Sequence, residues 1–244
     1  MSENTGPVTI AEDKASVPTK TIFWTPLDWH WQITLFNEVN NEQESGEDVS
    51  VMIFQANHDA NSYSSAWWLV NVPTPGRVGP IELPKIVQVG VLDKIEDDIP
   101  RLSGPADIKF GQHADVVQKN EEHGAEIMID RDSKPGKEIM VTNCKGNVKS
   151  LEMALYKSGK KLVSYKDVVP NTVVSFLLQP DVVYVTDGAN LTKGYEFKAS
   201  DEINKATKFS LSPDKLDINI KITRKPSGEL EFSELEQDVE HSTL

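Results

Sequence analysis

Tryptophan is the residue type in this sequence with the clearest capacity for binding. All five tryptophans lie within the first 68 residues: Trp24, Trp29, Trp31, Trp67 and Trp68. An indole ring offers a large apolar face and one N–H donor, which suits stacking on a flat ligand or on a sugar. On an extended chain Trp29 and Trp31 share a face, whereas Trp67 and Trp68 point to opposite faces. The tryptophans therefore either line a binding pocket or fill the core of a sheet protein.

A polar loop directly precedes the Trp67–Trp68 pair. It runs from Asn57 to Ser65 and is dense in small hydrogen-bonding side chains. Such loops beside exposed aromatic rings are typical of sugar sites and of small-molecule pockets, although ordinary surface loops have the same composition. We therefore count Asn57 and Tyr63 with the five tryptophans as candidate ligand-binding residues.

Histidines are the candidate metal ligands, but none of the five pairs at the close spacing of a dedicated metal site. His58 lies in the polar loop, and His30 lies between two tryptophans. His113 and Asp115 form a His-x-Asp pair, which would share one face of a strand. The candidate metal set is therefore His30, His58, His113 and Asp115, and chance proximity of histidine and acid is the competing interpretation.

Sequence motifs of catalysis are missing. The chain contains no Gly-x-Ser-x-Gly elbow, no phosphate-binding glycine loop, no dinucleotide fingerprint and no His-Glu-x-x-His. Its single cysteine, Cys144, has no evident group that would stabilise a thiolate, so we interpret it as an inert thiol. The sequence favours a protein that is not an enzyme, with a metal-dependent enzyme whose site is not readable from sequence as an alternative.

Charge and composition exclude several classes of partner. With 38 acidic and 25 basic residues the chain carries a formal charge of -13, which disfavours nucleic acid and anionic membranes. One cysteine allows no intramolecular disulfide. No apolar run resembles a signal-peptide core or reaches the roughly 20 residues of a membrane helix. We therefore expect a soluble, cytoplasmic protein.

Secondary-structure signals are mostly those of short strands, rich in β-branched and aromatic residues and bounded by turn formers. The predicted strands are 20–25, 31–39, 49–55, 66–72, 86–92, 126–130, 138–143, 172–178, 182–186, 195–199 and 216–223. Strands 126–130 and 138–143 flank a turn-rich loop and predict a hairpin. Strand 216–223 alternates apolar and polar residues, so one of its faces should be buried.

Two segments have helical features. Residues 148–157 place Val148, Leu151 and Leu155 on one helical stripe, and residues 200–207 begin with Ser-Asp-Glu. The fold class predicted from all these signals is mainly β: an antiparallel sandwich or barrel with at most one or two short helices. Its expected organisation is a flexible tail at 1–19, a single all-β domain at 20–232 with a seam or long loop at 96–105, and an acidic tail at 233–244.

One segment carries a resemblance to a known group of proteins. Residues 21–40, reading TIFWTPLDWHWQITLFNEVN, resemble cytosolic all-β proteins of mushroom fruit bodies, nearest to the pink chromoprotein type of oyster mushrooms. The resemblance implies a fungal, non-enzymatic protein that binds a small aromatic chromophore, with or without a divalent metal ion bridging the pigment and a histidine. It assigns no individual residue of this chain.

Three functions follow from these observations. The first is a binding protein for a small, flat, largely apolar or aromatic ligand, with indoles for stacking and His30 or His58 for a polar or metal contact. The second is a cytosolic lectin-like module, which would gain avidity as a homo-oligomer. The third is a metal-dependent enzyme with a dispersed site. We rank them in this order, because aromatic residues are clustered and catalytic residues are not.

Overall fold

The computed structural model describes residues 31–39, 48–83, 86–94, 100–118, 124–131, 136, 138–147, 149–179, 181–212 and 214–235. Within them, 61% of residues lie in strands and 3% in helix, and one short helix is present, which confirms the mainly β prediction. The predicted tail at 1–19 and the predicted strand at 20–25 lie outside the described residues. No helix in these ranges is long and apolar enough to cross a bilayer.

The strands and the helix have the following bounds in chain order. They are β1 (Trp31–Asn37), β2 (Val49–Phe54), β3 (Tyr63–Ser65), β4 (Trp68–Val72), β5 (Gly76–Leu83), β6 (Val87–Lys94), β7 (Pro100–Ile108), β8 (His113–Val117), β9 (Glu126–Ile129), β10 (Ile139–Asn143), β11 (Leu151–Lys157), β12 (Lys160–Val168), β13 (Thr172–Phe176), β14 (Val182–Asp187), β15 (Glu196–Phe197), α1 (Ala199–Ile203), β16 (Thr207–Ser210), β17 (Asp217–Arg224) and β18 (Leu230–Glu234).

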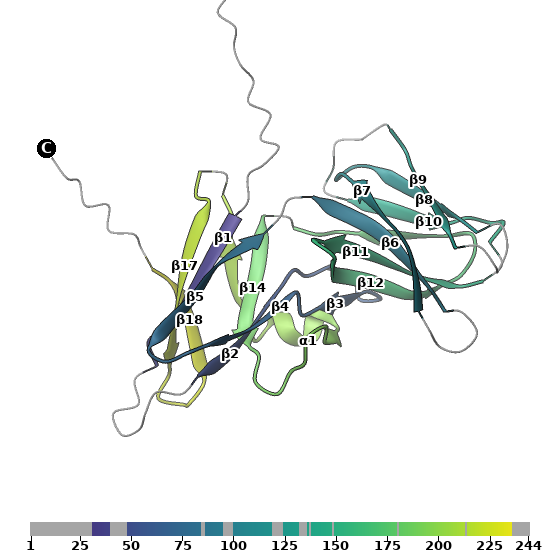
Figure 1. The fold of residues 1–244 in the computed structure, drawn as a ribbon. Coiled ribbons are helices and arrows are strands. Elements are labelled where there is room, and N and C mark those ends of the chain that lie inside the picture. Colours follow the sequence, from purple (N-terminus) through teal and green to yellow (C-terminus); the bar gives the residue numbers. More distant parts are fainter. Residues whose placement is uncertain are drawn as a thin grey trace, which may run out of the picture.

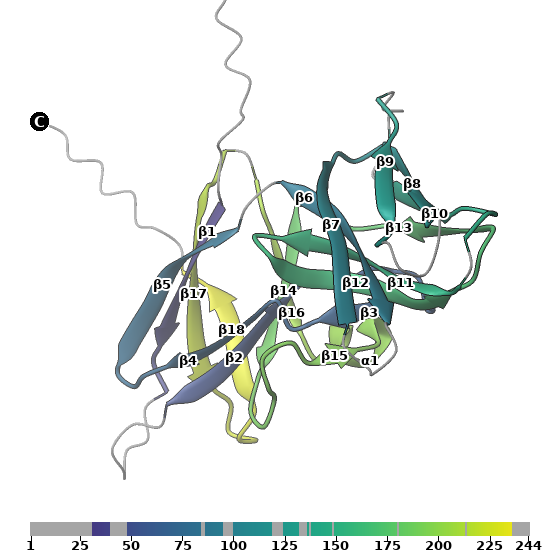
Figure 2. The same ribbon diagram turned by 45° about the vertical axis from the view of Figure 1, so that its right-hand side comes forward.

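The described strands form four open sheets, none of which closes into a barrel. Their strand orders are β18-β17-β1-β5, β16-β14-β2-β4, β15-β3-β12-β11-β6-β7 and β13-β10-β8-β9. Most neighbours are antiparallel, whereas β1 with β17 and β8 with β10 are parallel. Figures 1 and 2 show the first two sheets grouped on one side, the fourth sheet with most of the third on the other, and α1 beside β3 and β15.

Alternating side chains bury one face of most strands. In β17 the side chains of Ile218, Ile220 and Ile222 are buried, as the alternation in 216–223 predicts. Ile33 and Leu35 of the neighbouring β1 are buried in the same way. Buried residues from all four sheets belong to one continuous apolar cluster, which holds the sheets together.

The predicted hairpin at 126–130 and 138–143 is wrong in its pairing. Both segments are strands, β9 and β10, but β8 lies between them: it is antiparallel to β9 and parallel to β10. Strand propensity and the turn-rich loop correctly predicted the two strands, but they carry no information on which strand each one pairs with. Pairing was decided by β8, whose Ala114 and Val116 are fully buried in the core.

The helical alternative considered for 148–157 does not occur, because residues 151–157 form β11 in the middle of the six-stranded sheet. Residues 153–157 are all buried, so β11 is a central strand covered on both faces, and a near-continuous buried run cannot be distinguished from a helix by periodicity alone. The second helical alternative, at 200–207, is matched in its first turn only: α1 ends at Ile203, and β16 begins at Thr207.

Several strands were not expected from sequence, including β5, β7, β8, β12, β16 and β18. Residues 100–105 of the predicted seam lie in β7, which pairs with β6 and accommodates its irregular residues through a register shift between Val89 and Val91. Strand β18 extends to Glu234, so residues 233 and 234 of the predicted acidic tail belong to a sheet.

Candidate functional site

The pocket that contains the tryptophan pair lies where the edges of two sheets meet. Strand β4 is the last strand of one sheet, β5 is the last strand of another, and the two are in contact. The pocket between them has a volume of about 800 Å³ and is partly open to solvent. Its lining residues are Trp67, Trp68, Leu69, Val70, Asn71, Val78, Gly79, Pro80, Ile81, Glu82 and Ser158. Most of this lining is apolar, as in small-molecule sites.

Gly79 shapes the β5 wall of this pocket. Its φ is +145°, and a Cβ at this position would lie 2.8 Å from the carbonyl oxygen of Ile33 and 2.9 Å from Cα of Thr34. The pairing of β5 with β1 shifts register between Ile33 and Leu35, opposite this glycine. Only glycine allows the two backbones to approach so closely in this conformation.

Trp67 and Trp68 contribute differently, although they are adjacent in sequence. Trp67 precedes β4 and is only 3% exposed, whereas Trp68 is the first residue of β4 and is half-buried. Both residues line the pocket. The Nε1 atoms of both are buried without a hydrogen-bond acceptor in the described part of the protein. A buried indole N–H usually finds a partner, whereas both of these donors are unsatisfied; because less than 1 Å² of either atom is accessible, neither faces the open part of the pocket.

Two lysines from the β11–β12 turn lie against these indoles. The Nζ atom of Lys160 is 2.7 Å from the ring centroid of Trp68, and Nζ of Lys157 is 5.4 Å from that of Trp67. Ser158, between the two lysines in sequence, lines the pocket itself. The hairpin turn therefore brings two ammonium groups to the tryptophan pair, where cation–π attraction holds them.

Both ammonium groups are partly deprived of solvation. Burial lowers the pKa of Lys157 to about 8, and its side chain is only 2% exposed. Burial and the nearby charge of Lys193 lower the pKa of Lys160 to about 8. Lys157 donates a hydrogen bond to Oε1 of Gln55 over 3.1 Å. Among the described residues neither lysine forms a salt bridge with a carboxylate, so the charge here is uncompensated.

The other predicted ligand-binding residues lie elsewhere. Trp31 is a buried core residue of β1, and its Nε1 donates a hydrogen bond to the carbonyl oxygen of Ser212. Asn57 is buried and joins β12 to the end of β13, donating to the hydroxyl of Tyr165 and accepting from the backbone N–H of Leu177. Trp24 and Trp29 lie outside the described residues. The structure thus places only Trp67 and Trp68 of this set in the pocket between β4 and β5.

Tyr63 and His58 belong to a different region, beside α1. The ring of Tyr63 lies under the ammonium groups of Lys166 and Lys198. His58 lines a small pocket of about 150 Å³ with Asp59 and Lys198. Much of the loop bonds to itself, since Oδ1 of Asp59 accepts from the backbone N–H of Asn61 and its carbonyl oxygen accepts from Ser62.

The predicted His-x-Asp pair does share one face of a strand. His113 and Asp115 are alternate residues of β8, and Nε2 of His113 is 3.5 Å from Oδ1 of Asp115 and 2.6 Å from Oγ1 of Thr142. Across the described ranges no group of three or more His, Cys, Asp or Glu side chains could hold a metal ion, so His58 does not join this pair. His30 lies outside the described residues.

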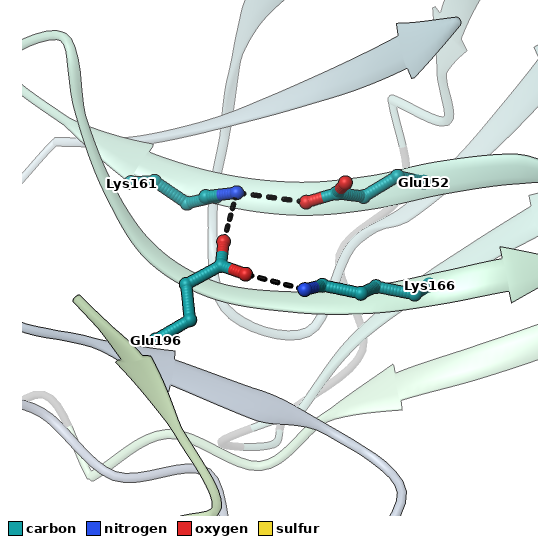
Figure 3. A network of polar contacts seen from close by, with 4 residues as sticks. All are labelled: Glu152, Lys161, Lys166 and Glu196. Carbon is teal, nitrogen blue, oxygen red and sulfur yellow. Dashed lines mark hydrogen bonds and ion pairs between the residues drawn. The ribbon is translucent and has the colours of Figure 1, made fainter. Parts of the chain in front are cut away.

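A network of ion pairs fixes the short strand β15 to the sheet next to the turn (Figure 3). Lys161 contacts both Glu152, at 2.8 Å, and Glu196, whose other oxygen is 2.5 Å from Lys166. Burial alone would raise the pKa of Glu196, but hydrogen bonds from the two lysines outweigh it and hold that pKa below its usual value. The network thus ties β15 to β11 and to β12, the strand that begins with Lys160.

Sequence reasoning missed the lysines and the β5 wall. Lys157 and Lys160 flank Ser158 and Gly159, a typical two-residue hairpin turn, but the helical interpretation of 148–157 concealed it. The β5 wall includes Gly79 and Pro80, which are atypical of a strand interior. Their placement opposite β4 depends on contacts between sheets, which no local pattern encodes.

Comparison with known proteins gives no match: no family model matches the chain, and neither a curated protein nor a solved structure does. The class is therefore defined by fold and site alone. It is a mainly β protein of open, packed sheets with a tryptophan-lined pocket between two sheet edges.

Proposed function

We propose that this protein is a non-enzymatic binding protein for a small, flat, largely apolar or aromatic molecule, held in the pocket between β4 and β5. The single observation that carries the proposal is the pair Trp67 and Trp68 in one apolar lining. Stacking on the indole rings supplies the affinity.

A pigment of the kind bound by the pink chromoproteins is one ligand of this chemistry. We assign it no metal, because His113 and Asp115 lie on β8, in a different sheet from β4 and β5. The alternative, glycan recognition by the polar loop at 57–65, has less support, because several of its polar groups already bond within the loop.

Titration with the neutral probe N-phenyl-1-naphthylamine tests the proposal. We expect saturable binding at one site, and at least a tenfold loss of affinity in Trp68→Ala. The matched control is Met128→Ala, which removes an exposed apolar side chain on β9, outside the pocket, and should leave affinity unchanged. Equal affinity in wild type and Trp68→Ala, with both proteins folded, would exclude this pocket as the site.

Native mass spectrometry of the protein from its source, read beside a visible absorption scan, addresses the natural ligand. Excess mass that is lost on denaturation supports a bound small molecule, and an accompanying visible band supports a pigment. No excess mass together with binding on a glycan array would favour the lectin-like alternative.

A further inference from the structure

Two lysines lie beside the lining of the pocket between β4 and β5, although the protein as a whole has a formal charge of -13 and the charged residue in the lining itself is Glu82. Lys157 and Lys160 lie against its two indoles, and neither has a carboxylate partner among the described residues. Lys193 lies near enough to Lys160 to disfavour its charged form. Like charges that gather without a counter-ion are unfavourable in a folded protein, and an anion would relieve the repulsion.

The hydrogen-bonding groups beside the pocket also favour an anion. Ammonium groups are donors only, and less than 1 Å² of each indole Nε1 is accessible, so the donor that lies beside the pocket is the amine of Lys160. The acidic side chain in the lining is Glu82, which is exposed on the opposite wall, on β5. The amine of Lys160 beside Trp68 therefore favours a ligand that brings negative charge to this side of the pocket.

We infer that the ligand is a planar aromatic anion, whose ring stacks at Trp67 and Trp68 and whose carboxylate, or an equivalent acidic oxygen, pairs with Lys160. This inference rests on the proposed function and specifies the chemical class of the ligand. Lys160 makes the direct contact, because its amine lies over the half-buried Trp68. Lys157, which is buried, contributes through its charge.

A matched pair of probes tests the inference: 2-naphthoate and its neutral isostere 2-naphthamide, titrated by tryptophan fluorescence at pH 6.5 and at pH 10. At pH 6.5 we expect naphthoate to bind at least tenfold more tightly than naphthamide. At pH 10 most of this preference should be lost, because Lys157 and Lys160 lose their protons as the pH rises through about 8 while naphthoate stays ionised.

The variant Lys160→Met keeps the apolar stem of the side chain and removes its charge. We expect it to abolish most of the preference for naphthoate at pH 6.5 without lowering the affinity for naphthamide. Lys208→Met removes an exposed charge on β16 and should change neither affinity. Equal binding of the two probes at pH 6.5 overturns the anion inference and leaves the proposed function standing. Failure of both naphthalene probes and of N-phenyl-1-naphthylamine to bind overturns the proposed function and this inference with it.

Discussion

The amine of Lys157 donates a hydrogen bond to the side-chain oxygen of Gln55, 3.1 Å away and 102 residues earlier in the chain. The bond joins the end of β11 to the residue that follows β2, and thereby links two sheets. Gln55 is neutral, so it satisfies one donor and leaves the charge of Lys157 unpaired. A buried ammonium with a neutral partner destabilises the fold at neutral pH.

Replacement of this lysine by methionine should therefore stabilise the protein. The pKa of Lys157 falls from 10.5 to about 8 on folding, which corresponds to a penalty of about 3 kcal/mol at pH 7. Loss of the bond to Gln55 offsets about 1 kcal/mol, so Lys157→Met should raise the free energy of unfolding by about 2 kcal/mol. Urea unfolding at pH 7 measures this difference.

The pH dependence of this effect has a definite sign. Below pH 8 the lysine is protonated in both states and the penalty is complete. Between pH 8 and 10.5 the unfolded chain binds more protons than the folded one, so this group makes the wild type more stable as the pH rises. The advantage of Lys157→Met should therefore shrink from pH 8 to 10.5. A pH-independent advantage would show that packing, and not charge, causes it.

Removal of the central carboxylate of the ion-pair network should destabilise the protein. Glu196→Gln keeps the shape of the side chain but deprives Lys166 and Lys161 of a charged partner, at a cost of about 1–2 kcal/mol at pH 7. Because folding lowers the pKa of Glu196, its contribution is complete above the unfolded value of 4.5 and is lost as the pH falls below it. The two proteins should converge in stability near pH 2.

Glu234→Gln is the matched control for the network. Its carboxylate pairs with Lys215 at a more exposed site on β18, so its loss should change stability by less than about 0.5 kcal/mol. Thermal unfolding of both variants between pH 2 and 7 gives the comparison. An equally small effect of Glu196→Gln would mean that the network does not order β15.

The fold class was predictable because burial follows local alternation. Strand β17 alternates Ile218, Ile220 and Ile222 with polar residues, and any sheet that buries one face needs that pattern. The partner of a strand was not predictable, as the separation of β9 and β10 by β8 shows. Partner choice depends on how several strands pack on one core, and that information is spread over the whole chain.

The candidate site was predictable only in part, for the same reason. Trp67 and Trp68 stood out by residue type and adjacency, and both line the pocket. Trp31 has the same residue type and is a core residue, so type alone does not separate the two roles. Lys157 and Lys160 lacked any signal of binding, because their approach to the indoles depends on the contact between a hairpin turn and another sheet.

Truncation should distinguish the two roles of tryptophan. Trp31→Ala removes a buried ring and its hydrogen bond to Ser212, so we expect a loss of about 3–5 kcal/mol in stability. Trp68→Ala removes a half-buried ring and should cost about 1–2 kcal/mol in stability. It should also lower probe affinity at least tenfold. Urea unfolding and probe titration on the same samples separate these effects. Normal stability of Trp31→Ala combined with weak binding would assign Trp31 to the site instead.

Substitution of Gly79 should affect both the fold and the pocket. In Gly79→Ala the new methyl group would collide with the backbone of Ile33 and Thr34, and the φ of +145° disfavours any side chain, so we expect a loss of about 2–4 kcal/mol. Gly159→Ala is the control, because Gly159 also has a positive φ, of +71°, but a Cβ added there would meet no atom within 4 Å. It should lose only about 1 kcal/mol. Because the collision moves β5 away from β1, Gly79→Ala should also lower the affinity for naphthoate more than Gly159→Ala does. Equal losses of stability and affinity in the two variants would show that β5 has room to accept a side chain.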